Sequence, residues 1–254
     1  MMKFLSACTF YNKNLTNTGN TLVPENTSRV SSWLVPIAYF LGRYFVIPAY
    51  FGNIKITGQE YLPTDGPVIF APTHRSRWDS LLLPYAAGRH VTGRDMRFMV
   101  TINECKGLQG WLVRHLGGFA VNIDRPAIAT LRHVLDLMQQ KQMLVIYPEG
   151  GIFRDGKIHT LKPGISRLAL TAESNYPGLG IKIIPVAIQY SQPYPNWGTN
   201  INIHISEHID VVNYLEGNLK SQAKKLTADL TNELQKLTYQ QSENNPHILA
   251  EIRS

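Results

Sequence analysis

Residues 67–79 read PVIFAPTHRSRWD, an apolar stretch that ends in polar and charged side chains. A short apolar stretch bounded by proline is typical of a buried strand. His74 follows it, and Asp79 comes just before the apolar Leu81-Leu82-Leu83 of a predicted helix. Active sites of open α/β sheets lie at the carboxyl ends of the strands. The stretch therefore predicts a strand, a candidate site and then a helix.

On both sides of this stretch, short apolar segments alternate with longer helical patterns. This alternation predicts βαβ units and an α/β fold with a mostly parallel sheet flanked by helices. The predicted strands are Ile54–Thr57, Pro67–Ala71, Arg97–Val100, Phe119–Ile123, Met143–Tyr147, Lys182–Tyr190 and Asn200–Ser206. The predicted helices span residues 79–89, 107–116, 126–140, 164–175 and 218–241, and leucines at helical spacing make the last one amphipathic.

Residues 31–52 are the most apolar part of the chain and read SSWLVPIAYFLGRYFVIPAYFG. Their length approaches the about 20 residues of a membrane-spanning helix. Pro36, Pro48 and the central Arg43, with Trp and Tyr spread along the segment, instead favour short helices in the membrane interface. A spanning helix and a buried helix of a soluble core remain alternatives. The predicted organisation is a flexible leader at 1–28, membrane-interface helices at 29–53 and an enzymatic domain at 54–254.

Composition excludes several classes of protein. With 44% hydrophobic and 17% charged residues, the chain can bury a sizeable core, and two cysteines are too few for a disulfide scaffold or an all-cysteine zinc site. The eight histidines show no ligand spacing, so no metal is expected. A net charge of +7 predicts attraction to nucleic acid, anionic lipid or phosphorylated substrates. Nucleic acid fits poorly, because the aromatic residues concentrate in the apolar segment.

The spacing of His74 and Asp79 suits general-base chemistry. The carboxylate can accept from one imidazole nitrogen while the other takes a proton from a hydroxyl group. Alternatively, Asp79 only caps the helix and His74 is a turn residue. A second pair with the same spacing, His90 and Asp95, precedes a strand and so falls at the opposite end of the sheet.

Two further strand ends carry cations. Met143–Tyr147 is followed by PEGGIFRDGK, which resembles a phosphate-binding P-loop but has Ile158 where the metal-binding hydroxyl belongs. Glycines with Arg154, Lys157 and Lys162 nearby predict an anion site there, and a solvated basic loop is the alternative. Arg125 follows another predicted strand, where it could bind phosphate, pair with Asp124 or cap a helix.

Taken in order, these segments resemble the glycerolipid acyltransferase family, of the 1-acylglycerol-3-phosphate acyltransferase type. The matching blocks are HRSRWD at 74–79, GGFAVNIDR at 117–125, YPEG at 147–150 and IPVA at 184–187, within residues 50–210. The chain departs from the family where Thr-Arg should follow Glu149-Gly150, so Arg154 is assigned to the phosphate. Met99-Val100-Thr101 also lacks the lysine that many members carry.

The resemblance implies transfer of a fatty acyl group from acyl-CoA or acyl-carrier protein to the sn-2 hydroxyl of 1-acylglycerol-3-phosphate. The product would be phosphatidate for phospholipid synthesis, made at the cytoplasmic side of a membrane. It implies no cofactor, His74 and Asp79 as catalytic residues, and membrane lipids as partners. The substrate-binding residues that it implies are Arg125, Glu149, Gly150, Arg154 and Lys162.

Other functions stay open at this stage. The acceptor could be glycerol-3-phosphate or another lysolipid, or the protein could be a thioesterase that uses His74 on water. A non-catalytic membrane-binding protein would explain the apolar segment and the basic surface alone. The chain has no G-x-S-x-G pattern, so no covalent acyl-enzyme is expected. The sequence predicts no oligomeric state.

Overall fold

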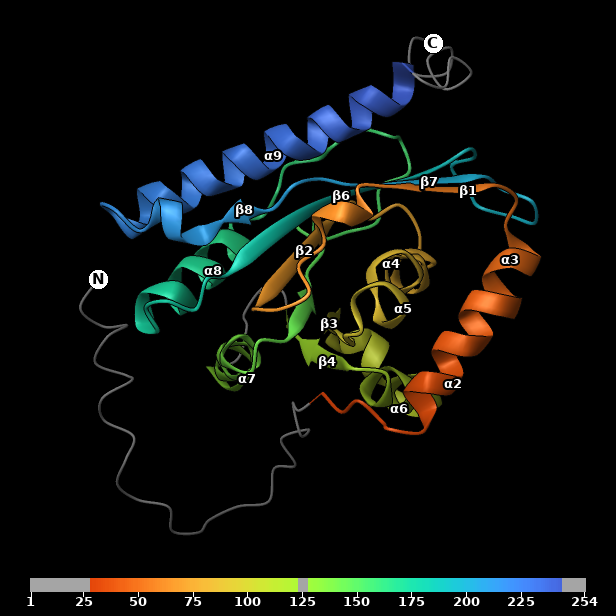
Figure 1. Cartoon of the computed structure of the whole chain (residues 1–254), viewed down its shortest axis with the longest axis horizontal. Helices are drawn as coiled ribbons and strands as arrows, with labels where there is room; N and C mark the ends of the chain where they lie inside the picture. The colour runs from red at the N-terminus through yellow and green to blue at the C-terminus, as the bar shows by residue number, and fades with distance from the viewer. Residues whose placement is uncertain (1–27, 123–127, 244–254) are drawn as a thin grey trace.

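The computed structural model describes residues 28–122 and 128–243 (Figure 1). These residues form an eight-stranded sheet in the order β1-β7-β6-β2-β5-β3-β4, with β8 paired to β6. The pairs of β6 with β7 and β8 are antiparallel, and the others are parallel. The strands are β1 (Ile54–Thr57), β2 (Val68–Pro72), β3 (Met96–Thr101), β4 (Gly118–Val121), β5 (Met143–Val145), β6 (Lys182–Tyr190), β7 (Ile201–Ile205) and β8 (Ile209–Asp210).

Helices cover both faces of the sheet. In Figure 1, α9 runs along one face, and α4 and α5 lie on the other. The α-helices are α2 (Leu34–Leu41), α3 (Ile47–Tyr50), α4 (Asp79–Ala87), α5 (Arg89–Thr92), α6 (Gly107–His115), α7 (Ile128–Gln139), α8 (Gly164–Asn175) and α9 (Leu219–Glu243). Short 3₁₀ turns lie at Gln59–Tyr61, Ile102–Cys105 and Val211–Tyr214.

Strand β2 is apolar at every position, and its burial explains this pattern. All five of its residues are buried. Val68 and Phe70 pack into the core with α3 and α4, whereas Ile69 and Ala71 pack into the core with α7, α8 and α9. Successive side chains of a strand point to opposite faces, so a strand covered on both sides needs apolar residues at every position.

The predicted α/β fold with a mostly parallel sheet agrees with the structure. Among the described residues, each predicted strand and helix is present, with ends displaced by a few residues at most. Ile123 and residues 126–127 of the predicted elements, and the predicted leader up to residue 27, lie outside the described residues. The helix α5 and the strand β8 were not predicted, because four and two residues are too few to show a hydrophobic period.

The N-terminal apolar segment follows one helical path from α2 through a π-helical turn at Gly42–Val46 into α3. Val35 and Ile47 are buried, whereas the outward side chains are large, apolar and exposed. The exposed ones are Trp33, Ile37, Phe40, Leu41, Tyr44, Phe45 and Val46. Within the part of the chain that the structure describes, no helix has both the length and the apolarity needed to cross a bilayer. Placement in a membrane interface stays a prediction.

The start of α2 is attached to the end of α6. Val30 and Leu116 form an antiparallel bridge, and the Arg29 amide donates to the Arg114 carbonyl at 3.1 Å. The outward face of α6 is also apolar, since Leu108, Trp111 and Leu112 are exposed. Two helices far apart in sequence therefore present apolar side chains to the exterior from adjoining positions.

Candidate active site

Three neighbouring strands bring the candidate residues together. Strand β2 lies between β5 and β6 and is parallel to both, so the carboxyl ends of all three meet at one edge of the sheet. His74 follows β2, Glu149 follows β5, and Tyr190 ends β6. This edge is where open α/β sheets bind their ligands.

Asp79, the first residue of α4, is fully buried and holds His74 in place. Its Oδ2 accepts from His74 Nδ1 at 2.9 Å and from the amides of Arg75 and Ser76 at 2.7 and 2.9 Å. Because Nδ1 donates to this carboxylate, Nε2 is the nitrogen that can accept a proton from a substrate. The turn between β2 and α4 thus orients a general base.

His90 and Asp95, which have the same spacing, are not arranged like His74 and Asp79. Asp95 instead accepts two hydrogen bonds from the Arg89 guanidinium, at 2.8 and 2.6 Å. The His90 ring packs edge-on against Tyr39, with centroids 5.8 Å apart.

Two tyrosines contact the dyad of His74 and Asp79. The Tyr147 ring stacks on the imidazole, with centroids 3.9 Å apart and 21° between planes. Tyr190 donates its hydroxyl to Asp79 Oδ1 at 2.6 Å. Burial, and next the charge of Asp79, raise the pKa of both phenols above their usual value. Both therefore stay protonated beside the carboxylate.

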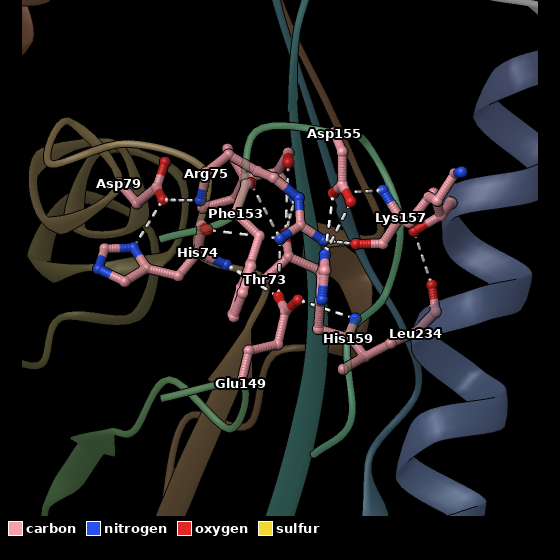
Figure 2. Close-up of polar contacts among 12 residues, drawn as sticks. Thr73, His74, Arg75, Asp79, Glu149, Phe153, Asp155, Lys157, His159 and Leu234 are labelled. Carbon is pink, nitrogen blue, oxygen red and sulfur yellow. Dashed lines mark hydrogen bonds and ion pairs between the residues drawn. The ribbon is translucent and has the colours of Figure 1, made fainter. Parts of the chain in front are cut away.

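Glu149 is buried and binds the His74 backbone and the Arg75 side chain in the turn after β2 (Figure 2). Its Oε1 accepts from the Arg75 guanidinium at 2.8 Å and from the His74 amide at 3.3 Å, and its Oε2 accepts from the His159 amide at 3.1 Å. Arg75 also donates to the carbonyl of Lys157 at 3.0 Å. This buried ion pair ties the turn after β2 to the loop after β5.

A large cavity of about 1420 Å³ opens in front of His74. Pockets that bind drug-sized ligands measure about 300–1,000 Å³, so this cavity has room for a longer group. Apolar side chains of the N-terminal segment, such as Val35, and of α6, such as Val113, line it together with His74 and Tyr147. The base therefore faces a space suited to a lipid chain.

The predicted substrate-binding residues lie in different places. Gly150 and Lys162 line the cavity, and the Lys162 side chain lies against Gly150. Gly150 has a φ of +72°, a backbone conformation that favours glycine. Arg154 instead lies over the exposed Tyr194 ring, 4.9 Å from its centroid. Arg125 lies outside the described residues. The role of each residue in binding substrate stays a prediction.

Arg75 and Tyr190 were not singled out by the sequence. Arg75 is nearly fully buried although it sits in a polar motif, and its adjacency to His74 was the only signal available. Tyr190 ends an apolar strand 111 residues after Asp79, and no spacing rule connects the two. Among residues 28–122 and 128–243, no group of His, Cys, Asp and Glu is arranged to hold a metal ion.

Comparisons with known proteins find acyltransferases that differ in their acceptor. Glycerol-3-phosphate acyltransferase 1, mitochondrial, of Mus musculus is 25% identical over 174 residues, which cover 65% of this chain and 21% of that protein. Glycerol-3-phosphate acyltransferase of Pseudoalteromonas atlantica is 30% identical over 136 residues, which cover 48% of this chain and 16% of that protein. The matched region thus spans about a fifth or less of the length of these relatives.

The crystal structure of the 1-acyl-sn-glycerophosphate (LPA) acyltransferase PlsC from Thermotoga maritima has a similar fold. The TM-score is 0.56 at 18% sequence identity, and the match covers 80% of each chain. Residues 53–189, more than half of the chain, match the family described as Acyltransferase, and this region contains His74, Asp79 and Glu149. The chain therefore belongs to the acyltransferase family.

Proposed function

We propose that this chain transfers a fatty acyl group from an acyl-CoA or acyl-carrier-protein thioester to the sn-2 hydroxyl of 1-acylglycerol-3-phosphate, forming phosphatidate. The observation that carries the proposal is the position of His74 between buried Asp79 and a large apolar cavity. A general base at such a cavity suits deprotonation of a lipid hydroxyl with water excluded.

In this reaction, His74 Nε2 accepts the proton of the acceptor hydroxyl as its oxygen attacks the thioester carbonyl carbon. The new C–O bond forms, the C–S bond breaks, and the imidazolium returns the proton to the leaving thiolate. Asp79 stabilises the imidazolium through its hydrogen bond with Nδ1. Acyl transfer is direct, and no residue of the protein becomes acylated.

Glycerol-3-phosphate is the second candidate acceptor. The sequence relatives named above are glycerol-3-phosphate acyltransferases, although this chain matches only a small part of each. The size of the cavity and the apolar exterior of α2 and α6 favour an acceptor that already carries an acyl chain and resides in a bilayer. We therefore place the lysolipid first.

The test is an acyl-transfer assay with detergent-solubilised protein, labelled acyl thioester, and a panel of glycerol-3-phosphate and lysophospholipids. Labelled phosphatidate from 1-acylglycerol-3-phosphate is the expected product. Labelled lysophosphatidate from glycerol-3-phosphate would establish the second candidate. Free fatty acid without any acylated acceptor would indicate a thioesterase, and no consumption of thioester would indicate a non-catalytic membrane-binding protein.

The acceptor phosphate should bind near Lys162, because, of the described cations that the sequence predicts for it, Lys162 lines the cavity and Arg154 does not. Lys162→Ala should raise the KM for the phosphorylated acceptor by about ten- to a hundredfold through loss of one charge-assisted hydrogen bond. The KM for the thioester and the kcat should change less. Arg154→Ala tests the other predicted cation: a larger rise in acceptor KM than in Lys162→Ala would return the phosphate to Arg154.

We also propose that the exposed apolar side chains of α2 and α6 dock on the membrane surface. Both helices line the cavity, so a bilayer in contact with them would lie next to the space that we assign to the acyl chain. The net charge of +7 favours an anionic surface. Aromatic residues such as Trp33 and Tyr44 suit the headgroup level.

Replacing Phe40 and Leu108 together with glutamate should weaken binding to anionic vesicles at least tenfold. Burying each of these side chains in lipid contributes about 1.5–3 kcal/mol. Tyr239→Glu is the matched control, since Tyr239 is 74% exposed on α9, which covers the opposite face of the sheet. Vesicle flotation measures binding. Equal loss in the control, or no loss in the double variant, would contradict docking through these helices.

A further inference from the structure

Asp79 is held at both carboxylate oxygens. Oδ2 binds His74 and the turn that carries it, while Oδ1 accepts from the Tyr190 hydroxyl at 2.6 Å. No second donor to Oδ1 is found among residues 28–122 and 128–243. Because a buried carboxylate oxygen without a donor is costly, Tyr190 stabilises the charge on Oδ1 and, together with the three donors to Oδ2, holds the carboxylate in one orientation.

Strand β6 places Tyr190 next to Asp79. It is the last residue of β6, which is parallel to β2, so its ring arrives at the edge of the sheet where His74 emerges. Its ring packs near Phe51, with centroids 6.2 Å apart, in the core shared with α3 and α4. Tyr190 is not among the residues that line the cavity, so its contact with the reaction runs through Asp79.

We propose that Tyr190 is a positioning residue for acyl transfer: its hydroxyl holds Asp79 so that Asp79 holds His74. This inference rests on the proposed function of His74 as general base. The other ionisable groups around the dyad are Tyr147, stacked on the imidazole, and the Arg75–Glu149 pair, which binds the His74 amide. None of these groups donates to Oδ1, so Tyr190 acts on the carboxylate in a way that they do not.

Tyr190→Phe keeps the ring and removes the donor. We expect kcat to fall about tenfold, with the KM values for donor and acceptor within twofold of wild type, because a hydrogen bond to a charged group is lost outside the cavity. The acid limb of kcat against pH should move up by roughly half a unit to one unit. Without the Tyr190 hydroxyl, the Asp79 carboxylate keeps more of its negative charge. It therefore stabilises the protonated imidazole of His74.

Tyr214→Phe is the matched control. Tyr214 donates to Asp229 at 2.8 Å, and it is a partly buried residue that packs against the core on the opposite face of the sheet. This variant also loses one tyrosine–aspartate hydrogen bond, so general destabilisation should appear in both variants. The displaced acid limb should appear only in Tyr190→Phe. An unchanged kcat and acid limb in Tyr190→Phe, or equal changes in both variants, would overturn the proposal.

A second substitution keeps the test valid if Tyr190→Phe does not fold. 3-Fluorotyrosine at position 190 retains the hydroxyl and makes it a stronger donor, so the acid limb should move to lower pH, opposite to the change in Tyr190→Phe. No displacement would overturn the proposal.

A measurement without substrate separates this inference from the reaction itself. The Nδ1 proton of His74, hydrogen-bonded to Asp79, should give a downfield NMR resonance, assigned by its loss in His74→Asn. Its position should change in Tyr190→Phe and not in Tyr214→Phe. If wild type shows no acyl transfer but this resonance moves, the proposed function fails, whereas the coupling of Tyr190 to the dyad of His74 and Asp79 stands. An active wild type whose resonance does not move in Tyr190→Phe would overturn the positioning role alone.

Discussion

Replacing His74 with alanine should lower kcat for acyl transfer by about 10²–10⁴ while the protein remains folded. This is the range lost when a positioned general base is removed. The imidazole is partly exposed to the cavity, so its loss leaves the core of β2 and α4 intact. Steady-state kinetics with 1-acylglycerol-3-phosphate, together with thermal unfolding of each variant, measure the two effects separately.

His208→Ala is the control for this substitution. His208 also faces an aspartate, with Nε2 3.5 Å from Asp210 Oδ1, but it lies beyond the amino end of β8 and outside the cavity lining. Its kcat should stay within about threefold of wild type, as expected for a surface change. A folded His74→Ala protein with turnover similar to this control would remove His74 from the mechanism.

Replacing Glu149 with alanine should destabilise the fold by about 3–5 kcal/mol, the loss expected when one partner of a buried ion pair is removed. Arg75 would keep its charge in a buried site, and the amides of His74 and His159 would lose their acceptor. Urea unfolding measures this change. Turnover should also fall, because the turn that carries His74 loses an anchor.

Glu233→Ala provides the comparison for the buried pair. Glu233 pairs with Lys236 at 2.6 Å on α9, and the Lys236 side chain is 65% exposed. Exposed pairs contribute about 0.2–1 kcal/mol, so this variant should unfold near wild type. If Glu149→Ala were equally mild and raised the acceptor KM, Glu149 would instead contact substrate, as the family resemblance implies.

Much of the fold could be predicted because its signals are local. The β2 stretch is apolar at every position, and α9 repeats leucine at helical spacing. Both elements can therefore be predicted without knowledge of the tertiary structure. The position of His74 could be predicted for a related reason. It directly follows a strand, and the topology of parallel sheets determines which end of that strand carries chemistry.

The rest depends on how loops fold back over the sheet. The loop after β5 turns so that Arg154 lies over Tyr194 while Lys162 returns to Gly150, and residue spacing does not encode that path. Arg75 resembles a surface arginine in a polar motif, yet its buried partner Glu149 lies 74 residues away. Tyr190 similarly depends on the order of β2 and β6 in the sheet.

The pairing of β1 with β7 has a consequence for folding during synthesis. Ile54 pairs with Ile201, so the partner of β1 is made long after α2 and α3 have left the ribosome. At about 5–20 residues per second, the delay is on the order of ten seconds. In that interval β1 is an unpaired edge, and the apolar helices before it have no completed sheet to pack against. Early contact of these helices with a bilayer would protect the nascent chain from aggregation before its last strands are made.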